Sequence, residues 1–231
     1  MTLKTDLETE CAKIFSSAWE KTDGTVVPNT EDMKLSNHGR NLDVAVLYAD
    51  LADSTIMVDS CGADFAAEVY KTFLYCAARI IRSNSGEITA YDGDRVMAVF
   101  VGDRKCSNAA RTALEIKWAV KNIVQVKMDA VYTTKNFVVK HVCGIDTTKV
   151  LVARTGIRGT NDLVWVGRSA NYAAKLSALS HSVSTYITAE VYKKLDDQSK
   201  LASGTDMWTM YKWTEFDGRI IYGSNYTWAI A

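Results

Sequence analysis

The sequence predicts an α+β fold whose core is a split βαβ unit, with an antiparallel sheet and helices on one of its faces. Two observations lead to this prediction. Strand-like apolar runs at 44–48, 88–91 and 96–101 surround a long helical segment at 62–82. An Asp-Gly pair at 92–93, between the second and third runs, is a strong hairpin signal. The chain has 231 residues, which is enough for one domain with a sizeable core.

The N-terminal part is expected to stand apart from this core. Apolar residues within 4–20 recur at helical spacing, which predicts an amphipathic helix whose apolar stripe needs a partner. The polar stretch from Thr22 to Asn41 holds the only proline, Pro28, and no periodicity, so we expect a loop. We therefore divide the chain into an N-terminal helix and linker, 1–41, and a main domain, 42–231.

The first strand and the first long helix of the main domain follow from patterning. The run at 44–48 is continuously apolar and stops abruptly at Asp50, as a buried central strand does at a polar site. The segment 62–82 repeats apolar side chains every three to four residues and ends near Ser83 to Gly86.

The second half of the chain is expected to add a helix, two strands, a loop, another helix and two closing strands. Their ranges, in that order, are 107–124, 136–145, 149–154, 156–161, 167–179, 207–214 and 219–229. The resulting order β, α, β, β, α, β is that of a ferredoxin-like fold.

Composition excludes several classes of protein. Lys and Arg number 27 and so do Asp and Glu, so the formal net charge of +0 offers no phosphate-neutralising surface, and we expect no nucleic-acid partner. No apolar stretch approaches the roughly 20 residues that span a bilayer, and the N-terminus carries acids where a signal peptide is apolar. Five scattered cysteines without CxxC spacing indicate reduced thiols. We expect a cytoplasmic protein without a membrane partner.

Two aspartates are candidates for a metal site. Asp50 ends the first strand and Asp94 lies in the hairpin, and these elements are neighbours in a split βαβ sheet. Such a pair suits a divalent cation whose other ligands are substrate phosphates, and the next residues offer backbone amides to a polyphosphate. These residues are Leu51, Ala52, Asp53, Ser54 and Thr55. On spacing alone, helix caps and turn residues are the more favoured interpretation of these aspartates.

Four ordered motifs resemble the class III nucleotidyl cyclases, the adenylate and guanylate cyclase catalytic domain, from about Asp43 to Ile230. VLYADLADST is similar to the first metal segment of that family and GEITAYDGDRVMAVF to the second. GIDTTKVLVARTG is similar to the approach to the dimerisation arm, and VGRSANYAAKL to the helix that stabilises the transition state.

The resemblance implies a reaction and residues for it. Asp50, Asp94 and the carbonyl of Leu51 would hold two divalent cations, Mn²⁺ or Mg²⁺, while the ribose 3′ oxygen attacks the α-phosphorus and pyrophosphate leaves. Asn171 would orient the ribose. Lys175, four residues on, stands where the family usually has an arginine, and it lacks the planar guanidinium fork.

Two basic positions remain open at this stage. Lys175 is otherwise a solvated lysine on a helix face. Arg219 looks like the position that reaches the terminal phosphates in some family members, but an arginine on a surface strand is an equal interpretation.

The base-reading positions depart from both purine patterns. Ala90 and Val164 stand where the resemblance places hydrogen-bonding residues, and neither side chain can form those bonds. Together with the retained metal residues, this resembles the pyrimidine (uridylate or cytidylate) cyclases of bacterial Pycsar antiphage systems. Their cyclic UMP or cyclic CMP activates a separate effector.

We expect UTP as the substrate, with CTP less favoured. Uracil offers two carbonyl acceptors, and nearby side chains provide mostly donors; these are Tyr48, Tyr91, Arg95 and Trp165. The aromatic residues are otherwise core packing. The alternatives are an adenylate or guanylate cyclase with an unusual pocket, or a noncatalytic nucleotide-binding module on the same fold.

The resemblance also implies a homodimer. In that family the metal aspartates and the helix of Asn171 and Lys175 belong to different subunits of one composite site. A chain that carries both halves is therefore expected to form a symmetric dimer with two shared sites.

Overall fold

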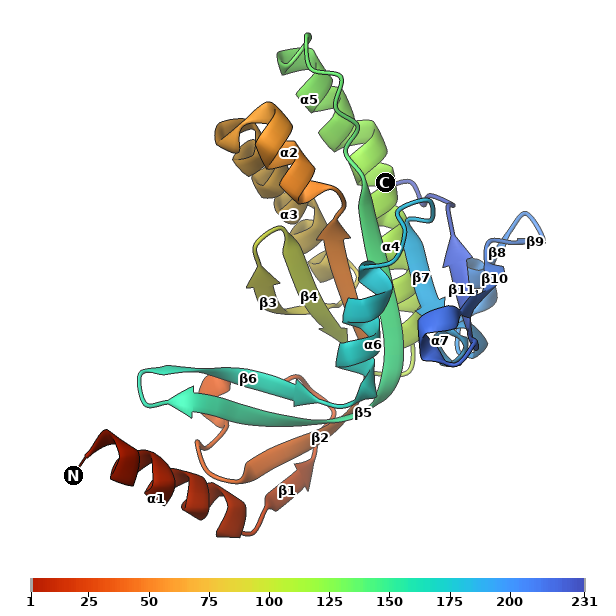
Figure 1. The fold of residues 1–231 in the computed structure, drawn as a ribbon. Coiled ribbons are helices and arrows are strands. Elements are labelled where there is room, and N and C mark those ends of the chain that lie inside the picture. The colour runs from red at the N-terminus through yellow and green to blue at the C-terminus, as the bar shows by residue number, and fades with distance from the viewer. Residues whose placement is uncertain (1, 231) are drawn as a thin grey trace.

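The computed structural model describes residues 2–230, and in this range nine strands form one mixed sheet (Figure 1). The sheet runs in the order β10-β11-β7-β5-β2-β4-β3, with β1 paired to β2 and β6 paired to β5. Its strands are β1 (Glu20–Asp23), β2 (His38–Leu51), β3 (Glu87–Asp92), β4 (Arg95–Phe100), β5 (His141–Ile157), β6 (Thr160–Val166), β7 (Thr185–Thr188), β10 (Thr209–Trp213) and β11 (Arg219–Ser224). A separate pair consists of β8 (Leu201–Ala202) and β9 (Thr205–Asp206).

Helices occupy both faces of this sheet and the N-terminal end of the chain. They are α1 (Leu3–Ser16), α2 (Ser54–Cys61), α3 (Ala63–Ser83), α4 (Lys105–Ala119), α5 (Gln125–Val131), α6 (Arg168–Ser177), α7 (Ala189–Lys193) and α8 (Asp197–Lys200). A π-helical turn, Val120–Val124, joins α4 to α5, and short 3₁₀ turns lie at Thr30–Asp32 and Thr214–Phe216. The predicted α+β fold class is confirmed.

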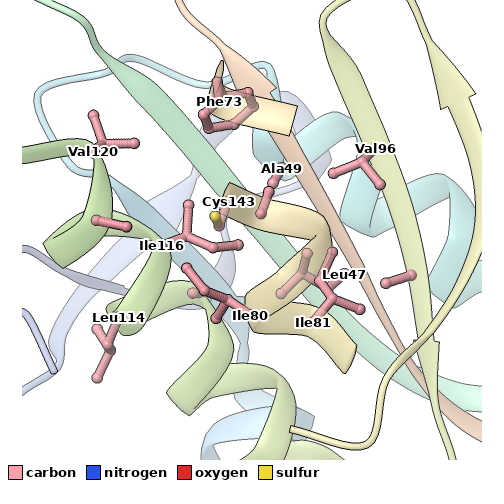
Figure 2. Packing of buried hydrophobic residues seen from close by; sticks show 14 of the residues in the cluster. Leu47, Ala49, Phe73, Ile80, Ile81, Val96, Leu114, Ile116, Val120 and Cys143 are labelled. Atoms are coloured by element: carbon pink, nitrogen blue, oxygen red, sulfur yellow. The ribbon is translucent and has the colours of Figure 1, made fainter. Parts of the chain in front are cut away.

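The expectation that helices cover only one face of the sheet is wrong. Along β2, Leu47 and Ala49 point toward α3 and α4, where they pack with Phe73, Ile81 and Ile116 (Figure 2). The alternate residues of β2 point to the other face and pack with α6, as the cluster of Val44, Val46, Ala170 and Ala173 shows. A central strand buried on both faces needs cover on both faces, which explains its continuous apolar run.

Helix α6 lies directly on β5 because β5 carries a glycine at the contact. A Cβ atom on Gly144 would stand 2.1 Å from the carbonyl oxygen of Ala173 and 2.5 Å from the amide nitrogen of Ser177. Only a residue without a side chain allows this close approach of two backbones.

The sheet is not antiparallel throughout, which corrects the predicted arrangement. Strands β5, β2, β4 and β3 are antiparallel neighbours, but β7 runs parallel to β5 and β1 runs parallel to β2. The chain passes from β5 to β7 through β6 and α6, and such a long crossover permits parallel pairing.

Strand β5 is a single element. The prediction of two separate strands at 136–145 and 149–154 is therefore wrong. The polar residues between them do not interrupt the ladder because their side chains have internal partners. Thr147 donates its hydroxyl to the carbonyl of Val44 at 2.7 Å, and Asp146 accepts hydrogen bonds from Arg168 and Thr188.

The segment from Thr22 to Asn41 is only partly a loop, contrary to expectation. It contains the end of β1, the first 3₁₀ turn and the start of β2, so the division placed between residues 41 and 42 falls inside a strand. All four residues of β1 are exposed, which explains why the sequence of β1 shows no alternation of apolar and polar residues.

Helix α1 is confirmed, but it ends at Ser16 and buries none of its residues. It lies beside β1 and the β5–β6 hairpin, at the opposite end of the molecule from α2 and α5 (Figure 1). The Asn37 side chain fixes its C-terminal end by donating to the carbonyls of Ile14 and Ser17 at 2.7 and 2.8 Å. No helix within residues 2–230 combines the length and apolar character needed to cross a bilayer.

Candidate active site

The sheet register brings Asp50 and Asp94 together. Asp50 is the penultimate residue of β2 and pairs with Arg95, the first residue of β4. Asp94 immediately precedes Arg95 in the two-residue turn between β3 and β4, and Gly93 adopts the positive φ of 61° at the first position of that turn.

Electrostatics show that the two carboxylates are close and poorly compensated. Burial, and then the charge of Asp94, raise the pKa of Asp50 to about 6. The Oδ2 atom of Asp94 is buried, and it has no hydrogen-bond partner within residues 2–230. A divalent cation between the carboxylates would supply the missing partner and remove their repulsion, so the pair fits Mg²⁺ or Mn²⁺.

This pair does not form a complete cation site from protein ligands. No group of three His, Cys, Asp or Glu side chains suited to a metal ion occurs in the described part of the chain. Further ligands must be backbone carbonyls, water or the oxygens of a bound phosphate, which is how Mg²⁺ is commonly held.

The segment after β2 offers part of the expected phosphate cradle. The Ala52 amide donates to the carbonyl of Lys140 at 2.9 Å, so this amide is already used and the prediction for Ala52 is corrected. Between residues 2 and 230, the amides of Asp53, Ser54 and Thr55 have no backbone acceptor. They stand at the N-terminus of α2, where amide groups and the helix dipole favour an anion.

Four predicted base-pocket residues lie on the face of the sheet that carries α6. Tyr48 pairs with Met97, which in turn pairs with Ala90, and these residues contact the cluster that contains Trp165. The guanidinium of Arg95 lies 5.3 Å from the centre of the Tyr48 ring. Arg95 also donates to Asp92 at 2.7 Å.

Trp165 is the buried member of this group. Its side chain is 8% exposed, and its Nε1–H has no acceptor in the described range. Buried indole N–H groups usually have a partner, so the Trp165 donor is an exception within this group.

The structure does not place Tyr91 and Val164 with this group, because the strand register points both side chains away from it. Tyr91 pairs with Val96, which belongs to the core under α3 and α4, and its side chain is 56% exposed. Val164 neighbours Trp165 along β6 and therefore points to the other face. Alternation along each strand places these residues outside the pocket.

Helix α6 presents the other half of the predicted site. Asn171 and Lys175 are both exposed and one helical turn apart. The ammonium of Lys175 lies 5.3 Å from the centre of the Phe216 ring, and the guanidinium of Arg219 lies 5.3 Å from that of Tyr172. These two rings pack edge to face, so the structure brings Lys175 and Arg219 to one aromatic surface.

Arg219 is not a free surface arginine, since it is anchored within the protein. Its guanidinium pairs with Glu190 at 3.3 Å, and Glu190 also pairs with Arg168 at 3.0 Å. Arg168 in turn donates twice to Asp146, a carboxylate with 0% exposed side chain, at 3.0 and 3.1 Å.

This ionic network was not found from the sequence. Asp146 falls in the gap between the expected strands at 136–145 and 149–154, and its partner Arg168 is 22 residues away. The network fixes the start of α6 to β5, and so it positions Asn171 and Lys175. The only sequence signal is an acidic residue directly after the apolar residues that end at Ile145.

The carboxylate pair and the α6 group stand on different elements of the chain, the first at the end of β2 and in the β3–β4 turn and the second on α6. No hydrogen bond or ion pair between residues 2 and 230 joins Asp50 or Asp94 to Asn171, Lys175 or Arg219. Each half-site is open on its exposed side.

Comparison with known proteins gives a family and close relatives. Residues 37–211 match the model of the adenylate and guanylate cyclase catalytic domain. Proteins named uridylate cyclase from Xanthomonas perforans and Burkholderia cepacia are 53% and 50% identical, each over 100% of both chains. One from Rhodovulum sp. is 36% identical over 98% of this chain and 97% of its own.

Solved cyclase structures share the fold at low identity. A bacterial light-regulated adenylyl cyclase superposes with a TM-score of 0.69 at 21% identity, over 81% of this chain and 53% of its own. The chain therefore spans about half of that protein. The guanylyl cyclase Cya2 gives a TM-score of 0.69 at 16% identity, over 82% of this chain and 95% of its own.

The family match covers most of the chain, and its range contains Asp50, Asp94, Asn171 and Lys175. The chain belongs to the adenylate and guanylate cyclase catalytic domain family.

Proposed function

We propose that this chain is a pyrimidine nucleotide cyclase that converts UTP to 3′,5′-cyclic UMP and pyrophosphate, with CTP as the less favoured substrate. The observation that carries the reaction type is the convergence of Asp50 and Asp94, with a buried carboxylate oxygen that lacks a partner. The choice of base is supported by relatives named uridylate cyclase that match the entire chain.

The proposed cofactors are two divalent cations, Mn²⁺ or Mg²⁺, held by Asp50, Asp94 and the carbonyl of Leu51. When bound, such cations lower the pKa of the ribose 3′ hydroxyl and neutralise the triphosphate. The 3′ hydroxyl loses its proton to water and its oxygen forms a bond to the α-phosphorus, the bond from that phosphorus to the bridging oxygen breaks, and pyrophosphate leaves.

The chain's own residues bind and orient the substrate in this proposal. The amides of Asp53, Ser54 and Thr55 bind phosphate oxygens, and Arg219 binds the terminal phosphates. Asn171 orients the ribose by hydrogen bonding. Lys175 stabilises negative charge at the α-phosphate as a point charge, without the bidentate geometry of an arginine.

The base pocket proposed here consists of Tyr48, Ala90, Arg95 and Trp165. The two carbonyl oxygens of uracil accept hydrogen bonds, and Arg95 and the unpartnered indole N–H of Trp165 are donors. Cytosine replaces one of these acceptors with an amino donor, which Arg95 cannot accept from. Ala90 offers no group that could read a purine.

The proposed assembly is a symmetric homodimer, because one chain presents two separate half-sites. The carboxylate pair of one protomer would face the α6 group of its partner, and the dimer would contain two such composite sites. We further propose a cytoplasmic enzyme whose cyclic nucleotide acts on a separate cyclic-nucleotide-binding effector in antiphage defence. The five cysteines are all free, which suits a reducing compartment.

The test is product identification. Purified protein is incubated separately with ATP, GTP, CTP and UTP in the presence of Mn²⁺ or Mg²⁺, and products are identified by mass spectrometry. The control carries Asp50→Ala and Asp94→Ala, which remove the proposed cation ligands.

Cyclic UMP that is absent from the control supports the proposal. Faster conversion of ATP or GTP than of UTP and CTP would make the protein a purine cyclase. Metal-dependent nucleotide binding without any product would indicate a noncatalytic nucleotide-binding module.

A further inference from the structure

An open pocket with both apolar and basic lining residues lies on the face of the sheet that carries α4, opposite the face of Asp50. Its volume is about 280 Å³, and it lies between the end of α4, the start of β5 and the segment before β7. Its polar lining includes Lys117, Lys121, Lys140, His141, His181 and Asn225, and no Asp or Glu side chain lines it.

The positive charges of Lys117 and Lys121 in this pocket have no acidic partner, unlike that of Lys140. Lys117 donates to the side-chain oxygen of Asn225 at 2.8 Å and to its carbonyl, and both acceptors are neutral. Burial and the charge of Lys121 lower the pKa of Lys117 to about 8. Neither lysine has an ion pair within residues 2–230. Ammonium groups held together without an anion are destabilised, and an anion would relieve this.

A buried imidazole adds an unsatisfied polar atom to the same cavity. His141 is 4% exposed, and its Nε2 has no hydrogen-bond partner in the described chain. Burial lowers the pKa of His141 to about 3, so its ring is neutral near pH 7. A neutral imidazole can still donate one N–H to an acceptor oxygen. Such unpartnered buried groups are rare unless a ligand or water completes them.

We propose that this cavity is a binding site for a small phosphate anion, inorganic phosphate or pyrophosphate, separate from the Asp50–Asp94 site. Lys117 and Lys121 supply the charge that recognises it, and His141 supplies a buried donor. Several oxygens on one compact anion match several donors that converge from α4 and β5. The anion-binding claim does not depend on catalysis.

The cavity is connected to the phosphate segment of the proposed active site. The Lys140 ammonium is 3.2 Å from the His181 ring and 4.0 Å from the Asp53 carboxylate, and the Lys140 carbonyl accepts from Ala52. An anion in the cavity competes with Asp53 for Lys140 and His181. Anion binding therefore changes the electrostatic surroundings of the segment that follows β2.

The experiment measures binding without turnover. Isothermal titration calorimetry at constant ionic strength, with EDTA present, compares pyrophosphate, phosphate and UTP on the full-length wild-type chain. The variants are Lys117→Met and Lys121→Met, with Lys127→Met on α5 as the matched control outside the cavity. A fourth variant carries both Asp50→Ala and Asp94→Ala. Thermal melting without anion verifies that each variant is folded.

We expect pyrophosphate or phosphate to bind once per chain, with affinity about tenfold lower in Lys117→Met and in Lys121→Met, since each loses one charged hydrogen-bonding group. Affinity should be unchanged in Lys127→Met and in the double aspartate variant. Lys121 is exposed, so its variant tests the site even if Lys117→Met is destabilised.

Three results would overturn the proposal. Equal anion affinity in the wild type and in all three lysine variants would show that the pocket does not bind the anion. Loss of binding in the double aspartate variant would assign the anion to the carboxylate site. Lysine-dependent binding of UTP, but of neither small anion, would make the cavity part of the nucleotide site. Absence of cyclase activity would overturn the proposed function and leave these binding results unaffected.

Discussion

At Asp50, burial and the neighbouring Asp94 both favour the protonated carboxyl group, and this raises its pKa to about 6 from a usual value near 3.8. The ionised pair is therefore unfavourable in the protein without a cation. Residues arranged for function commonly reduce stability in this way, because the same charges that bind a cation repel each other without it.

Replacing Asp50 with Asn should stabilise the cation-free protein. Because the pKa of Asp50 is raised in the folded state, ionisation of Asp50 lowers the free energy of unfolding. This destabilisation is complete above about pH 6 and is lost as the pH falls toward 4. We expect Asp50→Asn to raise the free energy of unfolding by about 2 kcal/mol at pH 8, a value discounted for partial solvent exposure.

Urea unfolding in EDTA at a series of pH values measures this difference. It should shrink toward zero near pH 4, and Mn²⁺ at pH 8 should stabilise the wild type more than the variant. Equal stability of the two proteins at pH 8 in EDTA would contradict the electrostatic strain assigned to Asp50.

Arg95 should determine which base is accepted. Arg95→Ala removes the guanidinium over the Tyr48 ring, and we expect kcat/KM for UTP to fall by at least about tenfold, the loss typical of one charged hydrogen bond. Arg82→Ala, on the exposed side of α3, is the matched control. Steady-state kinetics with UTP and CTP make the comparison. An equal decrease in kcat/KM for UTP and for CTP would mean that Arg95 acts on the carboxylates and does not read the base.

At the scale of elements, the sequence predicted those parts of the fold that local periodicity determines. The strand that contains Val46, the long helix α3 and the β3–β4 hairpin were all expected from their own residues. Strands β1, β6 and β7 were not. Strand β1 and most of β6 are exposed, and the partners of the four-residue β7 lie far along the chain.

The candidate site was predictable to the same extent. Asp50 and Asp94 follow strand ends and could be found from motifs, whereas the face of Tyr91 depends on the register of β3. A bulge between Ile88 and Ala90 shifts that register. The partners of Asp146 cannot be predicted from the local sequence either, because they arise from the packing of α6 on β5.

The contact between Arg168 and Asp146 should hold α6 in place. Removing the arginine leaves a fully buried carboxylate without its charged partner, so we expect Arg168→Ala to lower the free energy of unfolding by about 3 kcal/mol. Arg158→Ala, in the exposed turn of the β5–β6 hairpin, should change it by less than about 0.5 kcal/mol. Chemical denaturation of the two variants tests this. Similar stabilities would mean that packing alone places α6.

At the scale of the whole molecule, the main feature is the separation of two half-sites within one chain. Asp50 and Asp94 stand at the end of β2 and in the β3–β4 turn, while Asn171 and Lys175 stand on α6. Neither half contains both the proposed cation ligands and the proposed ribose contact. The proposed reaction would therefore need two copies of the chain.

Mixing two inactive variants should restore part of the activity. In a dimer of Asp50→Ala with Asn171→Ala, one composite site carries both substitutions and the other carries neither. Random exchange at equal concentrations gives half heterodimers, so we expect about one quarter of the wild-type rate. Product formation before and after mixing measures it. No recovery from folded, exchanging dimers would place each complete site within one chain.

The uninterrupted course of β5 has a mechanical consequence. The strand begins at His141, opposite Leu51, and ends at Ile157 in the hairpin with β6, so its 17 residues extend over roughly 50 Å. The strand bends between the sheet and the hairpin (Figure 1). A displacement of the hairpin is therefore transmitted along one continuous hydrogen-bonded strand to the residues that pair with β2 beside Asp50.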